Sequence, residues 1–390
     1  MGAPRLALLG AFPYPLPQGS QVYFEDQARA LTRAGCDCTL FTYGRGAGPP
    51  PEDLRVVTSP TATAPRRMRS GPSLDKPFAD AALYRTYLEA CRETRFDAVL
   101  AHHSEAAAIA IAARRFTRVP VVYVVHTLLA VELSTYLPEW ATGGADALGG
   151  GIDRALARRA DGLVALAHSA ERALRAVARG PIAVIPPGLE PTTPPSREAI
   201  EAACARHGLT RDGYFLYSGN LDAYQELELL DAAAARLPAG APPVVVATHA
   251  PVSDAERSAI GSLRVVQVDD FAEMRGLVFG ARTLALLRRQ LGGYPIKLLN
   301  YMEAGRAILA FAPVAEGLVH GESAWLLDFE AGPDAIADAI ASLDTDAALR
   351  ARLGEGARRR LATHHDPAAR AEETLRFVDD VVGRCVSRAR

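Results

Sequence analysis

The chain has 390 residues, of which 49% are hydrophobic and 23% are charged; this is an ordinary globular composition and enough chain for two domains. Its formal net charge is -2, which excludes a global field that would draw the protein to nucleic acid, so any anion site must be local. The five cysteines are odd in number and irregularly spaced, which argues against a disulfide framework and predicts reduced thiols.

The sequence gives little indication of a membrane segment or a metal site. The first apolar run is short and interrupted by Arg5, and no stretch reaches the roughly 20 apolar residues of a membrane helix. We therefore expect a cytoplasmic protein, with peripheral contact at the inner membrane face left open. The basic run Arg66–Arg69 is compatible with acidic lipid, although a solvated loop explains it more simply. Cys36 and Cys38 lack a second ligand pair, so we expect no metal.

The first half alternates apolar runs with amphipathic stretches. Leu6–Ala11 predicts a buried strand, a Pro-rich loop ends at Gly19-Ser20-Gln21, and a helix follows from Val22 and stops at Gly35. By the same criteria, further strands are expected at 38–44, 56–57, 97–103, 119–127 and 162–167, and further helices at 79–95 and 106–116. This order predicts a doubly wound parallel sheet.

Two segments of this half have a distinct composition. Gly46–Lys76 is rich in Pro, Ser, Thr and Arg and predicts an irregular excursion. Glu139–Asp153 holds five glycines and predicts a mobile segment before a helix that ends at Arg159. Ser169 is expected to be the N-cap of the next helix.

The second half shows the same alternation of predicted strands and helices after a Pro/Thr-rich linker at 191–195. Strands are expected at 214–218, 242–249, 263–268, 283–287 and 307–313, a short extended piece at 323–329, and helices at 227–237, near Glu273 and over most of 334–390. The fold class predicted is α/β, with two doubly wound halves and a cleft between them.

The stretch from Arg288 to Gly305 is the most informative part of the second half. Gly292-Gly293 allows the backbone to approach a ligand, and Pro295 suits the first turn of a helix. Free N–H groups of that turn, with Lys297 beside them, predict an anion site. A loop and core helix with solvated arginines is the alternative interpretation.

Several segments in a fixed order resemble one family. They are FPYPLPQGSQVYFEDQARALTRAG, VVYVVHT, ALAHSAERAL, VIPPGLEP, YSGNLDAYQELELL, GGYPIKLLNYMEAGRAILAF and HGESAWLL. Together these segments, spread over nearly the whole chain, resemble the retaining glycosyltransferases of family four, which have the GT-B fold. The resemblance implies two Rossmann-like domains facing each other across a cleft: an acceptor domain at 1–190 and a nucleotide-sugar donor domain at 191–365. Residues 366–390 are expected to form a helix that packs back toward the first domain.

The resemblance also implies an activity. Such enzymes move a sugar from a UDP- or GDP-sugar to an acceptor with retention at the anomeric carbon. They need neither metal nor cofactor, and the nucleotide-sugar is a co-substrate. The acceptor, whether lipid carrier, glycan or small metabolite, is not readable from the sequence.

The residues that match the family's functional positions fall into three groups. The catalytic group, which would meet the sugar or the departing diphosphate, is His126, Arg288, Arg289 and Lys297. The donor-binding group is Gly219, Asn220, Gln225, Gly293, Tyr294, Pro295, Ile296 and Asn300. The acceptor or phosphate loop is Gly19, Ser20, Gln21, His103 and Glu105.

The sequence departs from the family at four positions. Asn220 and Gln225 replace the usual Arg and Lys of the first donor loop, and Gly292 and Asn300 replace two glutamates. The resemblance to a family subset with a Tyr-Gln pair, like Tyr224-Gln225 here, implies that the later arginines take over this role. The departures favour altered donor choice or, as the alternative, a catalytically weakened nucleotide-sugar-binding protein.

Structural explanations compete at each remaining position. His126 alone fits a satisfied core histidine, and Gly19, Gly188 and Gly219 fit plain turns. For His103 the competing explanation is a helix cap at Ser104. Glu132 and Tyr136 fit either an acceptor loop or a solvated helix. Glu303, one helical turn beyond Asn300, is a weak substitute for the missing ribose ligand. A sugar-nucleotide epimerase would need paired carboxylates in the cleft, and the sequence shows no clear pair.

Overall fold

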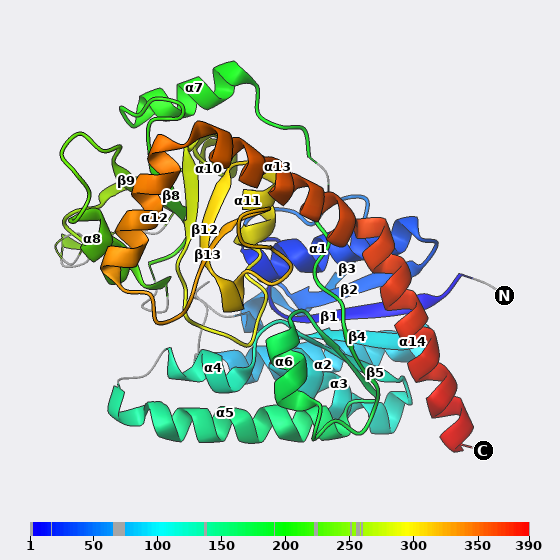
Figure 1. Cartoon of the computed structure of the whole chain (residues 1–390). Helices are drawn as coiled ribbons and strands as arrows, with labels where there is room; N and C mark the ends of the chain where they lie inside the picture. Colours follow the sequence, from blue (N-terminus) through cyan, green and yellow to red (C-terminus); the bar gives the residue numbers. More distant parts are fainter. Residues whose placement is uncertain are drawn as a thin grey trace. The chain divides into compact units, whose positions relative to one another are not determined.

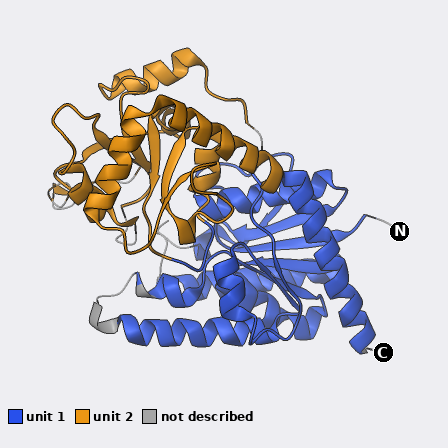
Figure 2. Ribbon diagram, viewed as in Figure 1, with its two compact units in different colours: residues 1–190, 291–294, 366–390 blue, residues 191–290, 295–365 orange. Residues whose placement is uncertain are grey.

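The computed structural model describes residues 3–16, 18–64, 75–135, 139–190, 192–221, 225–249, 252–254, 258 and 260–389. The basic run at 66–69, Tyr136 and Tyr224 lie outside these ranges. Two compact units make up the chain (Figure 2). Unit 1 holds Met1–Glu190, Leu291–Tyr294 and Asp366–Arg390, and unit 2 holds Pro191–Gln290 and Pro295–His365.

Unit 1 is built on a seven-stranded parallel sheet of order β3-β2-β1-β4-β5-β6-β7 (Figure 1). Its strands are β1 (Arg5–Pro13), β2 (Asp37–Tyr43), β3 (Arg55–Thr58), β4 (Ala98–His102), β5 (Val121–Val125), β6 (Gly162–Ala165) and β7 (Ile182–Val184). The central strands are buried along their whole length, as expected for a parallel sheet covered on both faces.

Helices cover both faces of this sheet. They are α1 (Gly19–Arg33), α2 (Lys76–Glu93), α3 (His103–Thr117), α4 (Leu129–Ser134), α5 (Glu139–Arg159), α6 (His168–Leu174) and α14 (Pro367–Ala389). Residues of α2, α3 and α5 share one apolar core with Ala7 and Leu9 of β1. On the other face, α1 packs against α14, and a Cβ on Gly162 of β6 would lie 2.5 Å from Val381 of α14.

The predicted mobile segment at 139–153 is wrong, because this stretch forms the first part of the 21-residue helix α5. Packing explains why the glycines do not break it. A Cβ on Gly149 would lie 2.7 Å from the backbone of Ala130, so glycine allows α4 to pack directly on α5. Asp153, buried on α5, accepts hydrogen bonds from the N–H groups of Leu129 and Ala130 and so caps α4.

Two predicted helix starts in unit 1 also differ. Helix α1 begins at Gly19, so Gly19, Ser20 and Gln21 form its first turn instead of ending a loop. Ser169 is not an N-cap: Ala167 holds that position, and the Ser169 hydroxyl accepts a hydrogen bond from the N–H of Gly292 at 3.2 Å.

Unit 2 holds a six-stranded parallel sheet of order β10-β9-β8-β11-β12-β13. Its strands are β8 (Phe215–Ser218), β9 (Val244–Thr248), β10 (Arg264–Gln267), β11 (Thr283–Leu286), β12 (Ala307–Phe311) and β13 (Trp325–Leu327). Its helices are α7 (Arg197–Arg206), α8 (Leu227–Ala234), α10 (Phe271–Gly280), α11 (Lys297–Ala304), α12 (Pro333–Thr345) and α13 (Ala347–His364). All strands predicted for this half are present.

Strand polarity gathers the chemistry-bearing residues. In a parallel sheet all carboxyl ends meet at one edge, where doubly wound sheets bind ligands. His102 ends β4 and His126 follows β5 at that edge of unit 1. Gly219 follows β8 and Arg288 follows β11 at the corresponding edge of unit 2.

Candidate active site

Three histidines cluster at the carboxyl edge of unit 1. His102 Nδ1 lies 2.8 Å from His126 Nε2, and both side chains are buried. The His103 ring stacks on His126 with centroids 4.1 Å apart, and Tyr23 meets His126 edge-on at 5.2 Å. His103 has a φ of 70°, a left-handed conformation that a residue with a side chain adopts at a cost. The strained backbone holds its ring against His126.

These histidines are neutral at pH 7. Burial is the main cause that lowers the pKa of each, to about 4 for His103 and well below the usual range for His102 and His126. A neutral His126 can form hydrogen bonds but carries no charge. His102 Nε2, the far nitrogen of the same pair, is buried and has no hydrogen-bond partner among the described residues.

A mixed cluster of charges lies beside the histidines. Lys76 Nζ, at the start of α2, is 2.8 Å from Glu105 Oε1 in the first turn of α3. Burial opposes ionisation of Glu105, but the charge and hydrogen bond of Lys76 outweigh it and lower the pKa of Glu105 to about 2. Ser104 donates to Glu105 at 3.0 Å. The alternative of a Ser104 helix cap is wrong, because His102 is the N-cap of α3 and makes no side-chain cap.

Residues 291–294 belong to unit 1 although they interrupt the sequence of unit 2. The N–H of Leu128 donates to the carbonyl of Gly292 at 3.0 Å, and Thr127 forms an antiparallel bridge with Gly293. A Cβ on Gly293 would lie 2.4 Å from the carbonyl oxygen of His126. The short segment is therefore fixed directly against the residue that ends β5.

Position 292 requires glycine for two reasons. Its φ is 94°, and a Cβ there would lie 3.2 Å from Val131 and 3.3 Å from Leu128. A glutamate at this position would be strained and crowded. The departure at Gly292 is thus built into the backbone, whose carbonyl and N–H are bonded to Leu128 and Ser169.

In unit 2 the predicted donor loop and Lys297 come together. Lys297 Nζ lies 2.9 Å from Tyr217 Oη and 3.2 Å from Gln225 Oε1, and 4.2 Å from the centre of the Tyr217 ring. Gln225 Nε2 donates to Asn220 Oδ1 at 2.9 Å. Gly219 has a φ of 140°, and a Cβ there would lie 2.6 Å from Lys297 Nζ. Glycine therefore lets the ammonium group reach the loop backbone.

The two predicted arginines have different environments. Arg289 donates to the carbonyls of Phe329 and Ala331 at 2.8 and 3.1 Å, pairs with Glu226 at 3.4 Å and stacks on Phe311. Arg288 is 9% exposed and donates to the carbonyl of Gln290 at 3.1 Å. The contacts of Arg289 tie the segment after β13 to the end of β11, and both arginines remain predicted ligands of the diphosphate.

Helix α11 starts later than expected. Its N-cap is Ile296, and the Pro295 carbonyl accepts the N–H of Leu298, so Pro295 lies before the helix instead of in its first turn. Asn300 lies one turn after Lys297 and is half-buried. Glu303 pairs with Arg275 at 2.9 Å and accepts a hydrogen bond from Thr192 at 2.7 Å, so it does not replace the missing ribose ligand.

The remaining predicted residues are placed as follows. Gly19 and Ser20 open α1, and the side chain of Gln21 is buried with an Oε1 that has no partner among the described residues. Tyr294 is buried in unit 1, and Gly188 packs on Pro367, where a Cβ would lie 2.9 Å from its Cα.

Sequence reasoning missed four residues that shape these sites. Tyr217 holds Lys297 and the carbonyl of Asn220, and Tyr301 accepts the N–H of Ser218 at 2.9 Å, which fixes α11 to the end of β8. Ser169 holds Gly292, and Lys76 holds Glu105. A polar group at the end of an apolar strand was the available signal for Tyr217; the other three depend on tertiary contacts.

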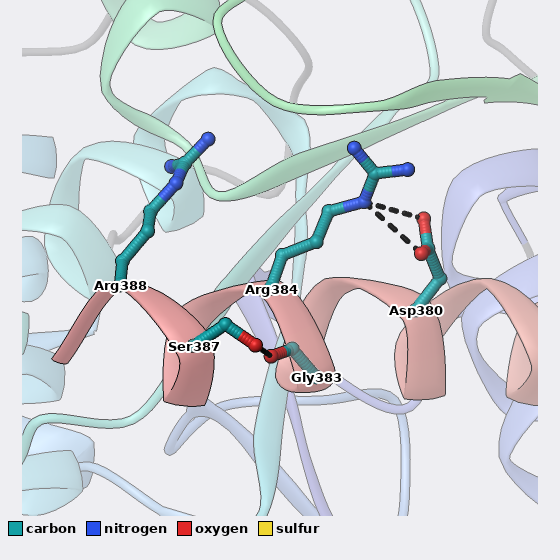
Figure 3. A pocket seen from close by; sticks show the side chains of 5 residues that line it. All are labelled: Asp380, Gly383, Arg384, Ser387 and Arg388. Carbon is teal, nitrogen blue, oxygen red and sulfur yellow. Dashed lines mark hydrogen bonds and ion pairs between the residues drawn. The ribbon is translucent and has the colours of Figure 1, made fainter. Parts of the chain in front are cut away.

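One hollow on the surface of unit 1 carries no site. It lies along α14 and is lined by Asp380, Gly383, Arg384, Ser387 and Arg388 (Figure 3). One helix supplies all of its walls, and Arg384 already pairs with Asp380 at 2.9 Å. Among the described residues no group of three or more His, Cys, Asp or Glu side chains is arranged to hold a metal ion, and no helix is long and apolar enough to cross a membrane.

Comparison with known proteins agrees with this geometry. Residues 17–193 match the family model described as Glycosyltransferase Family 4. The first half of the chain is therefore similar to glycosyltransferases of family 4. The match covers unit 1 from the proline before α1 to the linker and includes the histidine cluster. No curated protein sequence matches significantly.

Solved structures match over nearly the whole chain and show that the fold is GT-B. Sucrose-phosphate synthase from Thermosynechococcus elongatus has 18% identity and a TM-score of 0.79, with 98% of this chain and 100% of that chain covered. Anabaena Alr3699/HepE in complex with UDP and glucose has 15% identity and a TM-score of 0.73, with 96% and 99% covered. The catalytic domain of starch synthase IV from Arabidopsis thaliana, bound to ADP and acarbose, has 12% identity and a TM-score of 0.71, with 98% and 100% covered.

Proposed function

We propose that this protein is a retaining, metal-independent glycosyltransferase that moves a sugar from a nucleotide-diphosphate sugar to an acceptor. Unit 2 binds the donor and unit 1 the acceptor. The observation that carries the proposal is the position of Lys297 at the mouth of the first loop of unit 2. Tyr217 and Gln225 hold its ammonium group 2.9 and 3.2 Å away, next to the open backbone of Gly219.

The chemical demand is to stabilise a leaving group. The bond between the anomeric carbon and a diphosphate oxygen breaks, and a bond forms between that carbon and the acceptor hydroxyl oxygen. With retention, the hydroxyl approaches from the face that the diphosphate leaves, so the departing diphosphate takes the hydroxyl proton. Negative charge develops on the diphosphate, and fixed cations and N–H groups stabilise it. Lys297 and Arg288 supply the cations.

The protein's other predicted site residues support orientation. His126, neutral and fixed by His102, offers a hydrogen bond to a sugar hydroxyl. Asn220 and Gln225, bonded to each other at 2.9 Å, give the first loop a defined shape. Asn300, on the same face of α11 as Lys297, is positioned to bond ribose hydroxyls without a charge.

UDP-glucose is the first donor to test, because the similar HepE was solved with UDP and glucose. The experiment is a thermal-shift screen of UDP-, GDP- and ADP-sugars, followed by turnover of the one that stabilises most. We expect stabilisation by one donor in metal-free buffer with EDTA, and its loss in Lys297→Met. Wild-type affinity for the nucleotide in Lys297→Met would overturn the assignment of this site.

A nucleotide-sugar-binding protein with weakened catalysis is the second candidate. The observation in its favour is Gly292, whose backbone excludes the carboxylate that the family has there. Slow release of free sugar from the bound donor by the wild type, abolished in Lys297→Met, would favour the enzyme. Tight donor binding without hydrolysis or transfer to any acceptor would favour the binder.

A further inference from the structure

Lysine is almost absent from this protein. Of its 43 Lys and Arg residues only Lys76 and Lys297 are lysines. Both lie at the carboxyl edge of a sheet: Lys297 contacts the residues after β8, and Lys76 contacts the first turn of α3, directly after β4. Lysine is a compact point charge with three donors, which a planar guanidinium does not reproduce. The chain uses arginine at its other basic positions. At positions 76 and 297 it has lysine, whose compact ammonium group can bind several oxygen atoms that converge on one point.

Lys76 is surrounded by carboxyl groups. Its nearest is Glu105 at 2.8 Å, and the charges of Glu132 on α4 and Asp80 on α2 also act on it. Tyr43, at the end of β2, donates its hydroxyl to Asp80. Four elements, α2, α3, α4 and β2, therefore direct polar groups to one place beside His103, and the carboxyl groups there outnumber the ammonium group.

The cluster is partly open and incompletely bonded. The side chains of Lys76 and Glu105 are 26% and 32% exposed, so a ligand can reach them. The Tyr123 hydroxyl is fully buried, is affected by the charges of Asp153, Glu105 and Glu132, and has no hydrogen-bond partner in the part of the chain that the structure describes. A buried hydroxyl without a partner costs free energy that a bound hydroxyl group or water recovers.

We propose that Lys76, Glu105 and Glu132 form the acceptor subsite, and that the acceptor presents uncharged hydroxyl groups to it instead of a phosphate or carboxylate. This inference rests on the proposed glycosyl transfer and names its acceptor class. Sugar or polyol hydroxyls donate to the carboxylate oxygens and accept from Nζ. An anionic group would meet the carboxylate of Glu105 and would have to displace it from Lys76, and like charges in contact repel each other.

The test uses matched acceptor pairs. Free hexoses, a disaccharide and inositol are compared with their phosphorylated counterparts, by saturation-transfer NMR for binding and by UDP release for transfer. We expect the uncharged member of a pair to bind at least about tenfold more tightly, which corresponds to about 1.4 kcal/mol. Tighter binding of the phosphorylated members, or binding of no uncharged member, overturns the inference.

Variants of the cluster sharpen the test. Glu105→Gln with Glu132→Gln should shift the preference toward the phosphorylated members, because Lys76 then lacks both carboxylates. Lys76→Arg should raise the acceptor KM about tenfold, because a planar guanidinium does not reproduce the compact charge of the ammonium group. The matched control is Asp161→Asn, which breaks the 2.8 Å pair with Arg114 at the opposite edge of the same sheet. If Lys76→Arg and the double variant leave acceptor preference and KM unchanged, the subsite is wrong.

This result is separable from the proposed function. UDP affinity and donor hydrolysis report on unit 2 and on Lys297. If the wild type neither binds UDP nor hydrolyses the donor, the transferase proposal is refuted, even if sugars still bind at Lys76. Normal donor turnover with an anionic acceptor would refute only the acceptor class.

Discussion

Each sheet of this protein carries a lysine at its carboxyl edge, and the two lysines have different surroundings. Lys76 in unit 1 contacts the carboxylate of Glu105, whereas the contacts of Lys297 in unit 2 include a tyrosine hydroxyl and a glutamine amide oxygen. The ammonium group pairs with a carboxylate in unit 1, and in unit 2 it contacts a hydroxyl and an amide oxygen. A fixed cation among dipoles favours a diphosphate, whereas an ion pair favours hydroxyl groups. Similar sheet edges thus serve different chemistry because of their neighbouring side chains.

The largest expected effect comes from Lys297→Met. Removing one preorganised group that stabilises developing charge typically costs about 10²–10³-fold in kcat. We expect that loss in sugar transfer or donor hydrolysis, with an unchanged melting temperature. The control is Arg236→Met, which breaks a 2.7 Å ion pair with Asp334 in the same unit and should not alter turnover. Equal turnover rates for Lys297→Met and Arg236→Met would contradict a special role of Lys297 in the reaction.

Gly293→Ala tests the connection between the 291–294 segment and unit 1. The added Cβ would lie 2.4 Å from the His126 carbonyl oxygen, so the backbone must move. Overpacking of this kind costs about 1–3 kcal/mol, and we expect a lower melting temperature together with a fall in turnover. Gly143→Ala on α5 is the control, because no heavy atom lies within 4 Å of its Cβ position. That variant should be neutral or slightly stabilising.

Arg288→Met and Arg289→Met should separate function from stability within unit 2. Arg289 makes two hydrogen bonds to backbone carbonyls at 2.8 and 3.1 Å, so its loss should lower stability by about 1–3 kcal/mol. Arg288→Met should leave the melting temperature close to wild type and lower nucleotide affinity. Urea unfolding and UDP titration measure the two effects. A loss of UDP affinity in Arg289→Met alone would reverse the assignment.

The smallest effect concerns pH and Glu132. Burial and then the charge of Glu105 raise the pKa of Glu132 from 4.5 to about 7 in the folded protein. The folded state then holds more protons than the unfolded state between these values, so Glu132 lowers stability as pH rises from about 4.5 to 7. Glu132→Gln should gain on the order of 1 kcal/mol relative to wild type at pH 8 and little at pH 5. A constant difference at both pH values would contradict the raised pKa.

The histidine cluster has the opposite effect of Glu132 on how stability changes with pH. Burial lowers the pKa of His102, His103 and His126, so the unfolded state takes up protons first as pH falls below about 6.5, and stability decreases. The difference in unfolding free energy between wild type and Glu132→Gln at each pH gives the contribution of Glu132. The pH dependence that remains in Glu132→Gln includes that of the histidines.

The sequence by itself determined the order of strands and helices and both parallel sheets, because continuous apolar runs, helical periodicity and glycine loops are local signals. The grouping of Gly219, Asn220, Gln225 and Lys297 followed from the resemblance to the family. The sequence misjudged 139–153, since five glycines predict mobility unless a neighbouring helix needs their lack of side chains, as α4 does at Gly149. Only the tertiary structure decided that Arg289 holds backbone carbonyls, that Lys76 pairs with Glu105 across two helices, and that 291–294 belongs to unit 1. These features depend on contacts between residues far apart in the chain, and a side chain's charge or type does not specify which distant atoms will surround it.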